Sequence, residues 1–498
     1  MTLRLTMARL AMIAGVVAAG TAAVAAGAVP ARPEKIEFKA LKFDAPKAAD
    51  YRKVLPRSGV AVYLAPSNEL PLVQIVMVFK GGEYLEPAEK AGLAEVTGAM
   101  IRRGGTATMK AQEVDEKFDF LAAIASTNSG GTTSTASLNS LKSNLNESFP
   151  LFIDMLKNPG FQEDKWEIFK GEQVERMKQR NDDANTIAAR EWPALAYGRD
   201  HFEAREPTKQ SLEAITTSDM REFAKRVFNP GNVIIGVSGD FDPAQMMDML
   251  DKAFEGWAKG ERMPDPPAPT HTITPGVYRV EKDIPQGKVD IGLRGLRRDD
   301  PDQYAVAVMN DILGGGGFTS RIMSRVRSDE GLAYGAGSRF ASGVYYPGTF
   351  TATFASKNRT VALAIKIIME EFEKIKSGLV SDEEMKTAKA TFVETFPRFF
   401  ESRQAMIGLF INDEWTNRDP AYWQNYRDNI GKVSKEDVQR VAKKYLTLEK
   451  MAILVVGKWS EIEPGDLEGR AKMAEFFGGK ATELPLRDPL TLEPMAAK

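Results

Sequence analysis

The stretch Ile215–Val227, with the sequence ITTSDMREFAKRV, returns without a gap as VSKEDVQRVAKKY at Val433–Tyr445, 218 residues downstream. At the same offset the apolar run Val233–Val237 aligns with Met451–Val455, and a glycine follows each run two residues later. A helix-like segment and a strand-like segment therefore repeat together at one long spacing. Repetition of this length predicts two duplicated domains rather than a short-period solenoid.

Both halves mix short strand-like runs with long helix-like runs and lack the strict alternation that predicts a parallel sheet. The strand-like runs are Val60–Leu64, Leu72–Phe79, Val277–Val280 and Val289–Leu293, and the helix-like runs include Leu141–Leu156, Phe161–Gln179 and Val361–Ile375. This mixture predicts an α+β fold. We expect domains at residues 40–260 and 276–480, a proline-rich linker at 261–275 and an extended tail at 481–498.

Composition narrows the classes of function. The chain has 498 residues, of which 43% are hydrophobic and 27% are charged, as is typical of globular proteins large enough for several domains. The net charge of −2 and the isoelectric point near 6.1 provide no basic surface for a nucleic acid. There is no cysteine, so the chain can form neither a disulfide nor a lipid-attachment site.

The amino terminus has the pattern of an export signal. Arg4 and Arg9 precede the apolar run Ala11–Val17, and small residues follow up to Ala28. This order predicts a cleavable signal peptide at residues 1–28, export, and a periplasmic location without membrane insertion after cleavage. The alternative is a retained anchor, because Ala11–Val29 is nearly long enough to span a bilayer.

The stretch Gly314–Tyr334, GGGGFTSRIMSRVRSDEGLAY, carries the strongest local signal for a site. We expect its glycines to end the preceding helix, Thr319 and Ser320 to cap a second helix, and Arg327 and Tyr334 to point into one cleft. The alternative is a glycine-rich turn with a solvated arginine and a half-buried tyrosine. The stretch lacks the order of a phosphate-binding loop. Gly314, Gly315, Gly316 and Gly317 have no side chains and leave the backbone of this stretch accessible.

Three further stretches make the chain recognisable: Ala91–Met100 (AGLAEVTGAM), Arg103–Thr106 (RGGT) and Gly378–Lys389 (GLVSDEEMKTAK). With Arg327–Tyr334, they resemble the pitrilysin/insulinase superfamily of zinc metallopeptidases, in the branch similar to the mitochondrial processing peptidase. The resemblance implies two duplicated domains, each an antiparallel sheet with packed helices, that face each other as half of a clamshell. It also implies that Glu95 and Tyr334 face the same cavity.

The zinc motif of that superfamily, H-x-x-E-H, is degenerate here. Its three functional positions read Glu95, Gly98 and Ala99, so both histidine ligands and the general base are missing. The family's third ligand is a glutamate about 75 residues downstream, where this chain has Glu172 and Glu175. The chain's two histidines, His201 and His271, lie 70 residues apart. We therefore expect no metal in this chain and zinc in a partner subunit.

By the same resemblance, Arg327 and Tyr334 are catalytic residues that stabilise an oxyanion, and Gly314–Gly317 bind substrate. The implied protein is the exported non-zinc subunit of a heterodimeric metallopeptidase, whose homologous partner carries H-x-x-E-H, and its substrates are peptides. One alternative is an inactive peptide-binding or structural pseudopeptidase. Another is a self-sufficient peptidase with unusual ligands, which would require zinc in the isolated chain.

Overall fold

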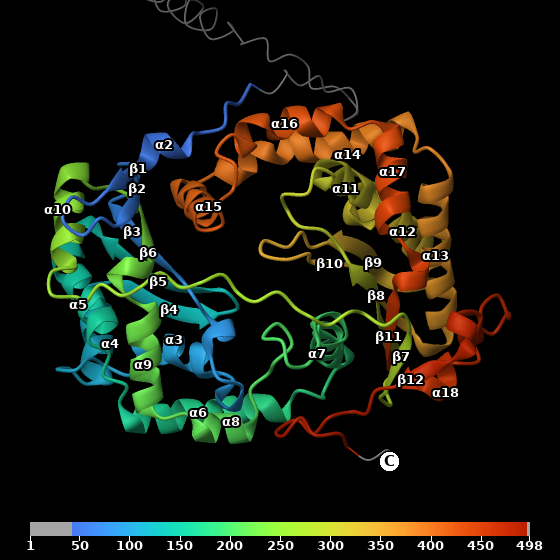
Figure 1. Ribbon diagram of the computed structural model, residues 1–498, viewed down its shortest axis with the longest axis horizontal. Coiled ribbons are helices and arrows are strands. Elements are labelled where there is room, and N and C mark those ends of the chain that lie inside the picture. Colours follow the sequence, from blue (N-terminus) through green and yellow to red (C-terminus); the bar gives the residue numbers. More distant parts are fainter. Residues whose placement is uncertain (1–41, 496–498) are drawn as a thin grey trace, which may run out of the picture. The chain divides into compact units, whose positions relative to one another are not determined.

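Two six-stranded sheets, one from each half of the sequence, organise the computed structural model, which describes residues 42–495 (Figure 1). The first sheet has the order β1-β2-β6-β3-β5-β4 and the second the order β12-β7-β11-β8-β10-β9. The strands of the first are β1 (Arg52–Val54), β2 (Ala61–Pro66), β3 (Leu72–Lys80), β4 (Ile124–Gly130), β5 (Thr133–Leu141) and β6 (Val233–Gly239). Those of the second are β7 (Gly276–Glu281), β8 (Gln286–Arg294), β9 (Ala333–Phe340), β10 (Thr349–Lys357), β11 (Ala452–Gly457) and β12 (Ala481–Glu483).

Five strands of each sheet follow the same order, so the two halves share one topology and the predicted α+β duplication is confirmed. The expectation of antiparallel sheets needs one correction, because β2 pairs with β6 in parallel and β7 pairs with β11 in parallel. In each half the chain crosses a layer of helices before it returns to the middle of its sheet. Such a crossover can bring a strand back in the direction of its neighbour.

Helices make up the rest of each half. The first half contains α2 (Ala48–Tyr51), α3 (Leu93–Arg103), α4 (Ala111–Phe120), α5 (Leu145–Lys157), α6 (Glu163–Lys178), α7 (Ala184–Tyr197), α8 (Lys209–Ala214), α9 (Thr217–Val227) and α10 (Pro243–Ala253). The second contains α11 (Gln303–Asn310), α12 (Arg321–Met323), α13 (Val361–Ser377), α14 (Asp382–Thr395), α15 (Arg403–Trp415), α16 (Tyr422–Lys432), α17 (Lys435–Tyr445) and α18 (Trp459–Ile462).

The repeated sequence forms α9 and α17, and the repeat extends to their caps. Thr216 caps α9 by accepting a hydrogen bond from the Asp219 amide, and Ser434 caps α17 by accepting one from the Asp437 amide. Each aspartate side chain accepts the reciprocal hydrogen bond, which completes a capping box in each half. The buried faces match at the same spacing: Met220, Phe223, Ala224 and Val227 in α9, and Val438, Val441, Ala442 and Tyr445 in α17.

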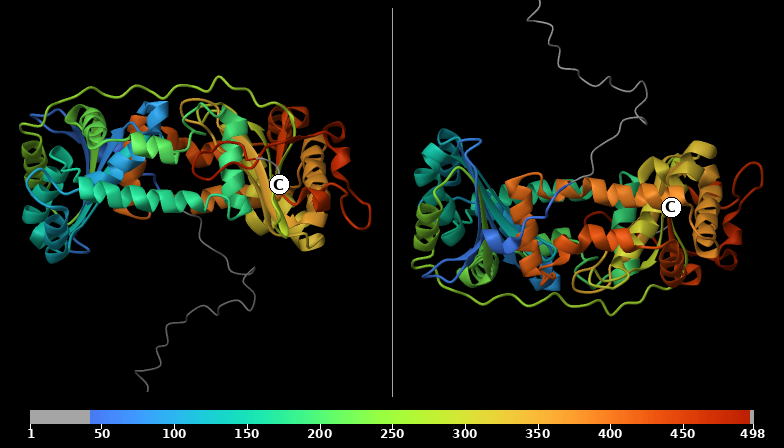
Figure 2. Two further views of the ribbon diagram at one scale, coloured as in Figure 1. Left: turned by 90° about the horizontal axis from the view of Figure 1, so that it is seen from below. Right: turned by 90° about the horizontal axis from the view of Figure 1, so that it is seen from above.

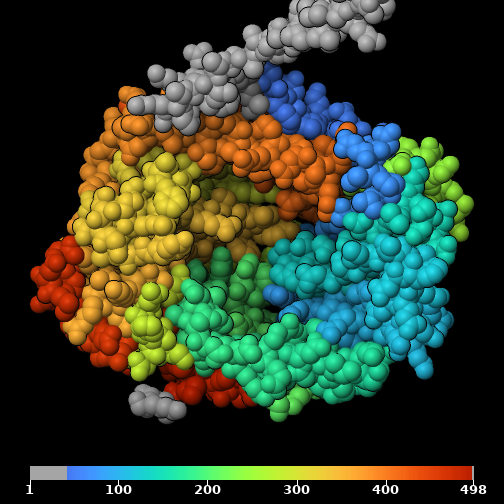
Figure 3. All heavy atoms as spheres, turned by 180° about the vertical axis from the view of Figure 1, so that it is seen from behind, coloured from blue at the N-terminus to red at the C-terminus, as the bar shows by residue number. Residues whose placement is uncertain are grey.

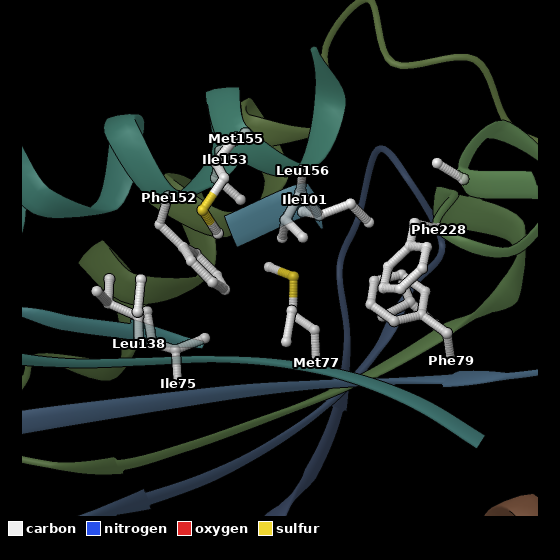
Figure 4. Close-up of a cluster of buried hydrophobic side chains, with 14 of the residues drawn as sticks. Ile75, Met77, Phe79, Ile101, Leu138, Phe152, Ile153, Met155, Leu156 and Phe228 are labelled. Atoms are coloured by element: carbon white, nitrogen blue, oxygen red, sulfur yellow. The ribbon is translucent and has the colours of Figure 1, made fainter. Parts of the chain in front are cut away.

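The core of the first half lies between its sheet and α3 and α5 (Figure 4). Ile75, Met77 and Phe79 alternate along β3 and point toward these helices, as the two-residue period of a strand requires. Ile101 of α3 and Phe152 of α5 meet them from the helical side. All five side chains are at most 1% exposed, so this core fixes where α3 lies on the sheet.

Each half sends one helix to the other half's sheet. Helix α15 packs on β2 and β6 of the first sheet, where a Cβ on Gly236 would lie within overlap distance of Ile407. Helix α7 packs on β8 and β11 of the second sheet, where a Cβ on Gly292 would lie 2.5 Å from the Trp192 ring. A glycine thus makes room for the incoming helix in both sheets.

The linker and the tail also connect the halves. Residues 257–275 contain no helix or strand, and Figure 2 shows them as an extended chain. The tail begins as β12 and continues along the first half, where the Asn181 side chain donates to the Arg487 carbonyl at 2.7 Å and the Lys209 amide donates to the Leu490 carbonyl at 2.8 Å. Figure 3 shows its red atoms against the teal atoms of the first half. The predicted domain boundaries remain predictions.

The predicted signal peptide, residues 1–28, lies outside the described residues. Between residues 42 and 495, no helix combines the length and the apolar character that a membrane span requires.

Candidate functional site

The degenerate motif lies on α3, whose first turn is held by a buried carboxylate. Glu86 accepts hydrogen bonds from the amides of Gly92 and Ala94 at 3.0 and 2.9 Å, and so satisfies two amides that the helix leaves without partners. Burial raises the pKa of Glu86 to about 7, although these two amides favour its ionised form. The beginning of α3 therefore depends on a carboxyl group that titrates near neutral pH.

Gly98, which occupies the general-base position, is packed against backbone. A Cβ there would lie 2.7 Å from the carbonyl carbon of Asn128 and closer still to the amide nitrogen of Ser129, both on β4. The Thr127 hydroxyl donates to the Gly98 carbonyl at 2.6 Å and holds the helix at this distance. Backbone atoms cannot turn aside as a long side chain can, so this packing excludes a glutamate at position 98.

The other motif positions and the candidate third ligands are equally unsuited to zinc. Glu95 is exposed, and Ala99 packs against the core. Glu172 forms a bidentate pair with Arg103 at 2.8 and 2.9 Å, and that guanidinium lowers the pKa of the Glu172 carboxyl. Glu175 pairs with Lys178 at 2.6 Å.

Both histidines bond to backbone carbonyls through Nε2, His201 to Pro267 and His271 to Leu195, each at 3.1 Å. In the described part of the chain, no three or more His, Cys, Asp or Glu side chains are grouped so that they could hold a metal ion.

The glycine run ends the preceding helix, as predicted. Helix α11 first continues into a π-helical turn, Asp311–Gly315, and Gly316 is the C-cap. Gly314 lies against β9, and a Cβ there would be 2.5 Å from the Ser338 amide nitrogen. The wider turn therefore brings bare backbone onto the strand.

The N-cap of the helix after the glycines differs from the predicted one. Ser320 stands at the N-cap of α12, but its hydroxyl donates back to the Gly317 carbonyl at 2.7 Å instead of accepting from a helix amide. The helix that follows is short, and the chain continues as a second π-helical segment, Ser324–Asp329.

Arg327 and Tyr334 contact each other, and a third residue joins them; that both point into one cleft stays a prediction. The Arg327 Nη1 donates to the Tyr334 carbonyl at 2.7 Å, and its guanidinium lies 4.5 Å from the Tyr334 ring and 4.7 Å from the Phe318 ring. Sequence reasoning missed Phe318, although an aromatic residue directly after four glycines was the available signal.

Two members of this trio are exposed, Tyr334 at 87% and Phe318 at 66% of their full accessibility, and Arg327 is half-buried. Tyr334 belongs to β9, the edge strand of the second sheet. Glu95 has Glu83 and Arg180 as charged neighbours: burial raises the pKa of Glu83, and the Glu95 charge adds to that rise. That Glu95 and Tyr334 face one cavity stays a prediction.

Comparison with known sequences agrees with the resemblance. A family model described as the peptidase M16 inactive domain matches residues 214–392. A protein from Helicobacter pylori named non-peptidase homolog YmxG is 23% identical over 80% of this chain and 92% of its own length. A protein from Bacillus subtilis named probable inactive metalloprotease YmfF is 25% identical over 47% of this chain and 54% of its own length.

Solved structures share the fold. A peptidase M16 inactive domain from Pseudomonas fluorescens covers 82% of this chain and 97% of its own, with a TM-score of 0.73 and 23% identity. The periplasmic protease PqqL from Escherichia coli aligns with a TM-score of 0.67 and 15% identity over 87% of this chain and 49% of its own. A chain of complex III2 from Candida albicans aligns with a TM-score of 0.64 and 14% identity over 82% of this chain and 96% of its own.

Proposed function

Since this chain is a pitrilysin-type homologue of the peptidase M16 proteins without the zinc ligands of that family, we propose that it is the non-zinc subunit of a heteromeric metallopeptidase. A homologous partner that carries H-x-x-E-H would bind the zinc and supply the general base. This chain would supply the half-buried Arg327, the exposed Tyr334 and a backbone surface for the peptide.

The arrangement of Arg327 and Tyr334 carries the proposal. The guanidinium is fixed by one hydrogen bond to the Tyr334 carbonyl and by two aromatic rings, so its other N–H groups remain available as donors. Among residues 42–495, no hydrogen-bond partner is found for the Tyr334 hydroxyl. A structural Arg–Tyr pair would ordinarily be buried, whereas this pair presents donors to the outside.

These donors suit peptide hydrolysis. When a hydroxide adds to a peptide carbonyl, negative charge develops on the carbonyl oxygen, and oriented donors stabilise that charge. Zinc, when bound in the partner, would supply the activated water. Arg327 and Tyr334 would donate to the oxyanion, and the exposed Gly315 and Gly317 would leave room for a peptide backbone to approach.

The test is reconstitution with the zinc-bearing protein encoded or purified together with this chain. We expect each protein alone to cleave an unstructured reporter peptide slowly or not at all, and the mixture to cleave it with saturation at one chain of each kind. Metal analysis should assign the zinc to the partner. Stoichiometric zinc in the isolated chain, or full activity of the partner alone, would refute the proposal.

We also propose that the chain works after export. The evidence is the order of residues 1–28, with basic, apolar and small residues in succession. Recovery of the full-length protein with Met1 intact from the cytoplasm would contradict this proposal.

A second candidate is a structural pseudopeptidase. The backbone packing at Gly98 and the similarity in fold to a complex III2 chain favour it. A stable complex in which substitution of Arg327 and Tyr334 leaves turnover unchanged would support this reading.

A further inference from the structure

A cavity that Arg327 and Tyr334 do not line lies where α15 and α16 meet the linker and the β9–β10 connection. Its volume is about 580 Å³, and an adjoining cavity of about 250 Å³ shares several of its lining residues. We call the two together the α16 groove. Its lining includes Arg298, Tyr304, Tyr345, Arg418, Tyr422 and Asn425. A site of this size accommodates a small ligand or a few residues of a peptide.

The Arg298 guanidinium lacks an acidic partner in this groove. Its Nη2 donates to the Thr416 carbonyl, while its Nη1 is buried and has no hydrogen-bond partner. Within residues 42–495, no carboxylate lies at ion-pairing distance from it, whereas neighbouring Arg297 forms a bidentate pair with Asp299 at 2.9 Å. Burial, and next the Arg418 guanidinium, lower the pKa of Arg298, and the more distant Asp413 and Asp299 carboxylates offset this only in part.

The carboxylates that line the groove are engaged elsewhere. Asp265 pairs with Lys80, Asp299 with Arg297, and Asp419 accepts a hydrogen bond from the Ala421 amide at 2.9 Å. The other two lining arginines are paired, Arg297 with Asp299 at 2.9 Å and Arg418 with Asp413 at 2.8 Å. Arg298 is therefore the lining cation best placed to receive an anion from outside.

Aromatic rings and asparagine side chains both line the groove. Tyr304 and Tyr422 stack with ring centroids 6.0 Å apart, and the Arg418 guanidinium lies 4.1 Å from the Tyr422 ring. Asn425 and Asn429 line the groove from the same face of α16, because residues four apart in a helix are neighbours. Asparagine side chains both donate and accept, as peptide groups require.

We propose that the α16 groove binds an extended peptide segment through a carboxylate that pairs with Arg298, while an adjacent aromatic or apolar side chain lies on the tyrosines. The carboxylate is either an Asp or Glu side chain or the free carboxyl terminus of the peptide. This site acts without the zinc-bearing partner and does not depend on the proposed peptidase activity, so the two proposals can fail separately.

The test uses the full chain and three pentapeptides that carry an uncharged fluorophore at the amino terminus. One has an internal Glu and an amidated end, one has Gln and a free carboxyl end, and one has Gln and an amidated end. We expect fluorescence anisotropy to show at least about tenfold tighter binding of one or both carboxylate peptides than of the neutral one. The peptide that binds identifies the source of the carboxylate.

Two variants and a control locate the binding. Arg298→Met should lower the affinity for the carboxylate peptide to that for the neutral peptide. Arg359→Met removes an arginine that lines a different cavity and should leave both affinities unchanged. Asn425→Asp places a repelling charge at an exposed position of α16. This variant should lower the affinity for the carboxylate peptide about tenfold and leave the affinity for the neutral peptide unchanged.

Equal affinity for all three peptides, or no binding of any, would overturn the proposal. So would an Arg298→Met variant that binds as the wild type does. If Arg298→Met does not fold, the Asn425→Asp result decides, because that exposed change leaves the core intact.

Discussion

The two halves place a glycine at the same kind of contact and use it differently. Gly98 of α3 lies on Ser129 of the edge strand β4, and Gly314 lies on Ser338 of the edge strand β9. The neighbouring motif positions, Glu95 and Ala99, have no histidine ligand for zinc. The backbone of β4 fills the space that a side chain at position 98 would need. Beyond Gly314, Phe318 and Tyr334 are exposed, and Arg327 is half-buried beside their rings. The first half thus has no room for a side chain at position 98, while the second half exposes the Tyr334 side chain.

The strongest test of this comparison is removal of the Arg327 and Tyr334 donors in the reconstituted complex. Tyr334→Phe should lower kcat by roughly 10² to 10³, as loss of one oxyanion donor typically does, and Arg327→Ala by a similar factor. KM should change less, because the donors act mainly when charge develops on the carbonyl oxygen. Tyr334→Phe keeps the ring beside Arg327, so a tyrosine needed only for packing would leave kcat unchanged.

Gly98→Ala should destabilise the first half by about 3 kcal/mol, because the added Cβ meets the backbone of β4, which cannot move aside. The matched control is Gly171→Ala in α6, where a Cβ has no neighbour within 4 Å and the change should be neutral or stabilise by up to about 1 kcal/mol. Urea denaturation provides both values. Equal stability of the two variants would show that position 98 has room for a side chain.

That result also bears on restoring the zinc motif. Glu95→His and Ala99→His add side chains at positions with more space, but Gly98→Glu meets the same backbone as Gly98→Ala. We expect the triple variant to be less stable than the wild type and to bind no zinc.

Glu86 gives the first half a pH dependence. Its folded pKa of about 7 is higher than the ordinary value of 4.5, so the folded state binds a proton more tightly than the unfolded state does. Its contribution to stability is therefore present at low pH and is lost as the pH rises from about 4.5 to 7. Glu86→Gln, which cannot ionise, should gain about 2 to 3 kcal/mol relative to the wild type between pH 5 and pH 8.

Denaturation curves of both proteins at the two pH values measure that gain. A difference between Glu86→Gln and wild type that stays constant across the range would mean that this carboxyl titrates at its ordinary pKa in the fold.

The smallest effects compare the repeated caps. Thr216→Ala and Ser434→Ala each remove the side-chain acceptor of an otherwise equivalent capping box, and each should cost about 1 kcal/mol of unfolding free energy. Similar values would show that the duplicated helices still have the same role in each half. A cost at only one cap would show that α9 and α17 have diverged in energy although their geometry is the same.

The sequence predicted those structural features that depend on residues close to one another in the chain. The gapless repeat and the apolar runs that follow it predicted α9, α17 and the strands after them, because these features depend on neighbours within one or two turns. The positions Glu95, Gly98 and Ala99 likewise predicted the loss of zinc ligands.

Other features depend on parts of the chain that sequence periodicity cannot bring together. Nothing in the local sequence of α7 or α15 indicates that each packs on the other half's sheet. The closed state of position 98 depends on the backbone of β4, about 30 residues away. A glycine run predicts that a helix ends. It does not predict that the last turn widens to the π-helical turn Asp311–Gly315, where Gly314 contacts β9.

The exchange of α7 and α15 has a consequence for biosynthesis. The last strand of the first sheet ends at Gly239, but α15, which covers part of that sheet, begins only at Arg403. At ribosomal speeds of about 5 to 20 residues per second, the covering helix emerges roughly 10 to 30 seconds later. The nascent chain must therefore carry an uncovered apolar surface throughout that interval, which is the kind of surface that holding chaperones bind before a protein is delivered to its destination.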